Sequence, residues 1–126
     1  MTHRLFPILA LLVFFCSAFG LRAEGLPAAE KAKIEALLTH VGGLADAKFV
    51  RNGKDYDAKS AVKFLRGKWE ANEEKVRSAE DFITVAATRS STTGKPYMIR
   101  LKGTPPTPCA GYLTAQLRKL ETEKGG

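Results

Sequence analysis

The stretch "ATRSSTTGKPYMIR", residues 87–100, carries most of the side chains in this sequence that could do chemistry. It places hydroxyls and cations between an apolar helical run and an alternating apolar run. Hydroxyls and free backbone N–H groups that follow a helix can cradle an anion, and nearby cations can close such a site. We therefore take residues of this stretch, with one arginine from an earlier turn, as the candidate binding site. They are Arg89, Ser90, Ser91, Lys95, Tyr97, Arg100 and Arg51.

An ordinary connection between two elements explains the same residues. In that interpretation Ser90 and Ser91 satisfy the carbonyls that end the preceding helix, residues 94–96 make a turn, and Arg100 is simply exposed. The sequence leaves both interpretations open.

Catalytic patterns that use such residues are incomplete here. The phosphate-binding loop and the Ser-x-x-Lys dyad both fail, because Arg89 and Thr92 stand where glycine and serine are required. A triad of His40, an aspartate and Ser90 or Ser91 keeps a small serine-dependent hydrolase open as an alternative. Neither paired cysteines nor clustered histidines indicate a metal site, so we assign no metal, cofactor or catalytic residue.

Residues 1–23 indicate where the protein goes. A charged start ending at Arg4 precedes an apolar run over residues 5–20, which is the pattern of a secretory signal peptide. A membrane-spanning helix needs about 20 apolar residues, and this run stops before Arg22. Cleavage near Ala23 predicts a periplasmic or secreted protein without stable membrane insertion, and an uncleaved anchor is the alternative.

The cysteines and the charge then suggest partners. Cleavage would leave Cys109 alone, either as a small buried hydrophobe or as an exposed thiol that links two copies into a dimer. The chain has 20 Lys and Arg against 13 Asp and Glu, and losing Arg4 and Arg22 leaves 18, a formal charge of +5. Because export makes nucleic acid a poor candidate, we expect an acidic protein, a glycan or another anionic envelope component as partner. The alternative is that the charge only keeps the protein soluble.

Residues 24–126 suffice for a single small domain with one core. The spacing of apolar residues and the capping residues predict four helices. The first starts at Pro27 and stops at Gly42-Gly43, the second is capped by Asp57, the third is capped by Ser78 and ends near Thr88, and the last starts at Pro108 after a cap at Thr107.

Asn52-Gly53 is a strong hairpin signal, because both residues tolerate the positive φ of a type I′ turn. The two-residue turn places Phe49 opposite Tyr56 and Arg51 opposite Lys54, so two cations flank the turn on the face of the aromatic pair.

A third strand is predicted over residues 97–101 from its alternating pattern, whereas the prolines within 104–108 argue against a further strand. The expected fold is α+β, with about four helices packed on a small three-stranded antiparallel sheet that includes the Asn-Gly hairpin. Which hairpin strand the third strand joins stays open.

Four segments occur here in a characteristic order: "FVRNG", "AVKFLRGKW", "SAEDFI" and "RSSTTGKPYMIR". On these segments the chain resembles the small exported bacterial proteins of the YfeK type, a domain of unknown function, over about residues 28–101. The resemblance implies a signal peptide and a periplasmic or secreted α+β domain, and it transfers no catalytic residue. We therefore expect noncatalytic binding of an acidic ligand or envelope partner. A small serine-dependent hydrolase and a structural envelope protein without a ligand are the alternatives.

Overall fold

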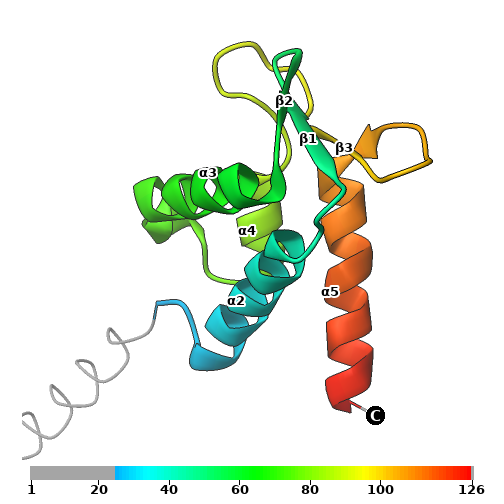
Figure 1. Cartoon of the computed structure of the whole chain (residues 1–126). Helices are drawn as coiled ribbons and strands as arrows, with labels where there is room; N and C mark the ends of the chain where they lie inside the picture. The colour runs from blue at the N-terminus through cyan, green and yellow to red at the C-terminus, as the bar shows by residue number, and fades with distance from the viewer. Residues whose placement is uncertain (1–24, 126) are drawn as a thin grey trace, which may run out of the picture.

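The computed structural model describes residues 25–125, so the predicted signal peptide over residues 1–23 lies outside the described residues. Within that range there are four α-helices, α2 (Ala28–Gly42), α3 (Ala58–Ala71), α4 (Ala79–Ala86) and α5 (Cys109–Gly125), and a 3-10 turn, η2 (Glu73–Lys75). Four short strands, β1 (Lys48–Arg51), β2 (Lys54–Tyr56), β3 (Met98–Arg100) and β4 (Thr107–Pro108), form one antiparallel sheet in the order β2-β1-β3-β4 (Figure 1). The α+β class is confirmed.

The predicted number of three strands is wrong, because Thr107 and Pro108 form β4 beside β3. A proline lacks the N–H that a central strand needs, but β4 lies at the edge of the sheet, where proline is tolerated. Thr107 therefore belongs to a strand, and α5 begins at Cys109 and not at Pro108.

The hairpin has the predicted register. Phe49 lies opposite Tyr56 and Arg51 opposite Lys54. Asn52 and Gly53 both have positive φ, 52° and 79°, as a type I′ turn requires. The open question about the third strand is answered by β1, which pairs with β3 on its other side.

Side-chain caps start α3 and α4 as predicted. The Asp57 carboxylate accepts from the Ser60 N–H at 2.9 Å and starts α3. The Ser78 hydroxyl accepts from the Asp81 N–H at 3.0 Å and starts α4, while the Asp81 carboxylate accepts from the N–H of Arg77, the residue before the cap, at 3.0 Å.

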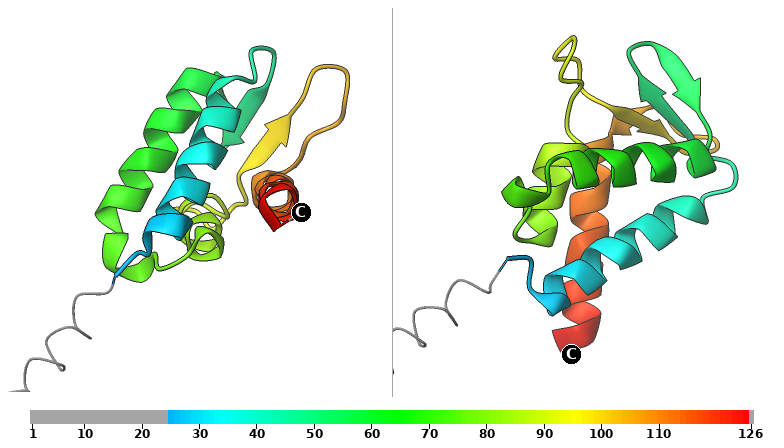
Figure 2. Two further views of the ribbon diagram at one scale, coloured as in Figure 1. Left: turned by 90° about the horizontal axis from the view of Figure 1, so that it is seen from below. Right: turned by 90° about the vertical axis from the view of Figure 1, so that its left-hand side faces the viewer.

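The core lies where the helices meet below the sheet. Figure 1 shows the sheet at one end of the helices, and Figure 2 shows α2 and α3 side by side. Trp69 of α3 packs in that core, edge-on to Phe82 of α4 with ring centroids 5.8 Å apart. Within the described range, no helix is both long and apolar enough to cross a bilayer. The hairpin therefore lies at one end of the molecule, next to α3 (Figure 1).

Candidate functional site

The polar groups of the loop after α4 are hydrogen-bonded to one another and to the hairpin turn. The Ser90 hydroxyl accepts N–H groups from Thr92 at 3.2 Å, from Thr93 at 3.3 Å and from the Asn52 side chain at 3.3 Å. The Gly94 N–H donates to the Ser90 carbonyl at 2.8 Å. An anion bound in this loop would have to displace these bonds. The stretch is an ordered connection, but not the one predicted: its turn lies over residues 91–93 and not 94–96, and the α4 carbonyl of Ile83 accepts from the Thr88 hydroxyl and not from a serine.

The other candidate residues of this stretch do not gather at one point. Arg89, Ser91 and Lys95 are exposed along the loop. Arg100 on β3 donates to Asp55 on β2 at 2.7 Å, and this ion pair already supplies its anion. Tyr97, by contrast, is buried and lies in a pocket together with Arg51.

The serine and histidine of the hydrolase alternative have separate partners. His40, at the end of α2, lies 2.6 Å from the hydroxyl of Tyr112 on α5. Ser90 is bonded to its own loop and to Asn52, as described above. Within residues 25–125, neither serine is hydrogen-bonded to a histidine, so the geometry gives this alternative no support. The same residues contain no group of three or more potential metal ligands.

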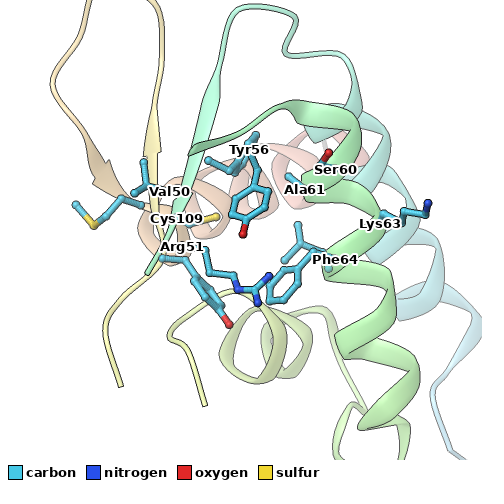
Figure 3. A pocket seen from close by; sticks show the side chains of 12 residues that line it. Val50, Arg51, Tyr56, Ser60, Ala61, Lys63, Phe64 and Cys109 are labelled. Atoms are coloured by element: carbon cyan, nitrogen blue, oxygen red, sulfur yellow. The ribbon is translucent and has the colours of Figure 1, made fainter. Parts of the chain in front are cut away.

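A pocket of about 340 Å³ lies between the hairpin and α3 (Figure 3). Its walls are the aromatic residues of the hairpin and α3 together with Tyr97, and Cys109 lies deeper in the lining. The residues that line it are Phe49, Val50, Arg51, Tyr56, Ser60, Ala61, Lys63, Phe64, Leu65, Tyr97, Met98 and Cys109. None of them is acidic.

Two cations lie on the aromatic rings at this pocket. The Arg51 guanidinium carbon is 4.4 Å from the centroid of Phe64 and 5.6 Å from that of Tyr56. The Lys68 ammonium is 5.7 Å from the centroid of Tyr97 and 5.9 Å from that of Phe64. These are cation–π distances, so the rings and not a carboxylate hold both charges in place.

The ion pairs of the described chain leave both cations out. Arg66 pairs with Glu35 on α2, Lys33 pairs with two glutamates, and Arg100 pairs with Asp55. Arg51 and Lys68 are half-buried and have no carboxylate partner within residues 25–125. This arrangement leaves their N–H groups available to an anion from outside.

Two titratable groups in the pocket lining, the Tyr97 hydroxyl and the Cys109 thiol, are held in their neutral forms. Burial raises the pKa of the Tyr97 hydroxyl, and the nearby Arg51 charge opposes this only in part, so the group is a hydrogen-bond donor at neutral pH. Burial raises the pKa of the Cys109 thiol to about 12, which makes it a poor nucleophile. Tyr97 can therefore donate a hydrogen bond in the pocket, and Cys109 is not an activated nucleophile.

Sequence reasoning named Arg51 and Tyr97 but missed Phe64 and Lys68. Phe64 lies outside the apolar stripe that predicted α3, so it had no assigned role in the core. A large apolar residue off the buried face of an amphipathic helix, next to cations, is the signal that could have found it.

Comparison with known proteins shows the family of this chain. A family model described as a family of unknown function (DUF5329) matches residues 28–121. The uncharacterized protein YfeK of Salmonella typhimurium is 41% identical over 68 residues, which cover 54% of this chain and 57% of that protein. No solved structure matches the chain. The expected resemblance is thereby confirmed, and the chain belongs to the DUF5329 family of unknown function.

Proposed function

We propose that this protein is an exported, noncatalytic domain that binds an anionic ligand in the pocket between the hairpin and α3. One observation carries the proposal: Arg51 and Lys68 lie half-buried on aromatic rings and have no carboxylate partner within the described chain.

The chemistry of a stacked guanidinium favours this use. A guanidinium that lies on a ring face keeps its N–H groups at the edge of its plane, where a carboxylate or phosphate can accept two of them. An aromatic ring compensates only part of the hydration that a half-buried cation loses, because a cation–π contact contributes about 0.5–2 kcal/mol. An anion would complete the site. This supports a binding role for Arg51, with Lys68 as the second cation.

Binding is tested by titrating the protein with small anionic probes, inorganic phosphate and glucuronate, while NMR follows the rings of Phe64 and Tyr97. We expect shifts at these rings that Arg51→Gln and Lys68→Gln weaken or abolish. Lys59→Gln is the matched control, since this exposed lysine on α3 does not line the pocket and carries the same charge. Shifts confined to residues 89–95, or shifts that survive Arg51→Gln, would overturn the choice of site.

Export is supported by the sequence pattern of residues 1–23 and has its own test. The full-length chain is expressed in a bacterial host, and the mature N-terminus is determined from the periplasmic fraction and the medium. We expect the chain there to start near Glu24. Full-length protein that stays in the cytosol would overturn the export part of the proposal without touching the pocket.

A further inference from the structure

We infer that the ligand of this pocket is a single-chain amphiphile, with an apolar body inside the pocket and one anionic head group at Arg51. The inference rests on the function proposed above and adds the class of ligand.

The interior of the pocket is apolar. Its inner walls come from the buried side chains of Phe49, Ala61, Leu65 and Cys109. Of the two charged lining residues, Lys63 directs its ammonium away from the rings, whereas Arg51 extends between Tyr56 and Phe64 (Figure 3). A small hydrophilic anion would leave these apolar walls in contact with water. A ligand with an apolar body covers them.

The charge lies at one side of this apolar space. Arg51 and Lys68 both contact the ring of Phe64, at 4.4 Å and 5.9 Å from its centroid. A head group beside Phe64 therefore meets Arg51 in the pocket lining, with Lys68 on the same ring just outside that lining, while the rest of the ligand lies against rings and aliphatic groups. One carboxylate or one phosphate monoester matches the Arg51 guanidinium, because either can accept two of its N–H groups at once.

The volume limits the length of the apolar body. A methylene-sized group or a water occupies about 30 Å³, so 340 Å³ accommodates about eleven such groups. This is the size of one medium-length chain or of a compact aromatic body. Two long acyl chains exceed this volume, so a single chain matches the pocket better than an intact diacyl lipid.

Calorimetric titration of the purified protein separates the contribution of the apolar body to the affinity from that of the anionic head group. The probes are decanoate, monodecyl phosphate, decan-1-ol and inorganic phosphate, all below micelle-forming concentrations. We expect at least one of the two decyl anions to bind about tenfold or more tightly than both the alcohol and inorganic phosphate. The preferred decyl anion distinguishes a fatty acid from a phosphate head group as the natural source.

Variants connect the binding to the named residues. Arg51→Gln is expected to weaken the decyl anion about tenfold or more and to leave decan-1-ol unchanged, while Lys59→Gln changes neither. Thermal unfolding of each variant serves as the check that it is folded. Arg51→Lys is expected to retain part of the anion binding that Arg51→Gln loses, because it keeps the charge.

The outcomes separate this inference from the function on which it rests. If inorganic phosphate binds in an Arg51-dependent way and a decyl chain adds nothing, the amphiphile is wrong and anion binding stands. If an acidic peptide binds and the decyl anions do not, the ligand is a partner protein and the inference is again overturned. If no anion binds at all, both proposals fail.

Discussion

Among the described residues, Ser90 is the one polar residue that is buried, with 3% of its surface exposed. Its hydroxyl accepts hydrogen bonds from the loop that follows it. Three N–H groups converge on its oxygen, two from the following backbone and one from Asn52. A nucleophilic serine would instead need a base within hydrogen-bond reach and an exposed oxygen. Ser90 is therefore a structural residue at the base of the loop.

Removing this hydroxyl tests that role. Ser90→Ala leaves three donors without their acceptor, so we expect the free energy of unfolding to fall by about 1–3 kcal/mol in urea denaturation. The neighbouring Ser91→Ala is the control, because Ser91 is exposed and we expect almost no change. An unchanged stability of Ser90→Ala, or labelling of Ser90 by a serine-directed probe, would contradict the structural role.

Glu30 joins two helices with one carboxylate. Its Oε1 accepts the N–H of Ala79 at the start of α4 at 2.8 Å, and its Oε2 accepts from Lys33 at 2.9 Å. The Ala79 N–H, and after it Lys33, hold the pKa of Glu30 below its ordinary value of 4.5. The folded state therefore favours the charged form of the Glu30 carboxylate.

The sign of the resulting pH dependence follows from the lowered pKa. Glu30 contributes its full stabilisation above about pH 4.5 and loses it as the pH falls through the folded-state pKa. Glu30→Gln keeps an acceptor for Ala79 but loses the charge, so we expect it to be less stable than the parent by about 1 kcal/mol at pH 7. Urea denaturation at pH 7 and pH 3 is expected to show this difference shrinking in acid. An equal difference at both pH values would show that the charge of Glu30 is not involved.

At the scale of elements, the hairpin and the loop after α4 hold each other. Asn52 takes the left-handed conformation that the turn requires, and its side chain both donates to Ser90 and accepts from the Thr93 hydroxyl at 2.6 Å. Arg51 is the residue directly before this turn. The loop that first suggested an active site therefore positions the strand end that carries the pocket cation.

Two substitutions separate the backbone and side-chain parts of this link. Asn52→Gly keeps the positive φ and loses the side-chain bonds, whereas Asn52→Ala loses both. We expect Asn52→Ala to be the less stable of the two by about 1 kcal/mol, and amide hydrogen exchange of β1 and β2 to be faster in both than in the parent. If Asn52→Gly exchanges as slowly as the parent, the contact with the loop does not hold the hairpin.

The elements that the sequence predicts best are those that local chemistry determines. The Asn52-Gly53 turn fixes its own register, and Asp57 and Ser78 each cap the helix that follows within three residues. The fourth strand was missed because Thr107 and Pro108 pair with residues about nine positions earlier, and only the tertiary arrangement makes them an edge. Local propensity against proline in a strand was overridden there.

Only the hairpin part of the pocket could be predicted, because local chemistry determines the hairpin but not the packing of α3 against it. The turn register places Arg51 and Tyr56 on one face, which the sequence alone indicates. That Phe64 of α3 lies beneath Arg51, and that Tyr97 meets Phe64 edge-on at 5.3 Å, depends on how the helix packs against the sheet. No spacing in the sequence encodes that crossing.

At the scale of the whole molecule, Cys109 lies where the sheet, α5 and the pocket meet. Its N–H donates to the Tyr97 carbonyl at 2.9 Å, its side chain is 2% exposed, and it lies in the lining of the pocket. The interpretation of Cys109 as a small buried hydrophobe is confirmed. A disulfide-linked dimer would therefore require this junction to open first.

Thiol labelling measures that opening. In a Cys16→Ser variant Cys109 is the only thiol, and raising its pKa from 9.0 to about 12 lowers the thiolate fraction about a thousandfold at pH 8. We expect a chromogenic disulfide reagent to label the native protein at least a thousandfold more slowly than the urea-unfolded chain. The rate is expected to follow the global unfolding equilibrium as urea is added, because the thiol is reached only when α5 leaves the sheet.

The two ways in which this prediction can fail identify different motions. Labelling that is fast in native buffer, with disulfide-linked dimers accumulating, would mean that α5 separates at its first turn while the rest of the domain stays folded. Labelling that is intermediate and slowed by decanoate, but unaffected by low urea, would mean that the reagent enters through the pocket. Protection that disappears only with global unfolding makes α5, the sheet and the pocket one cooperative unit.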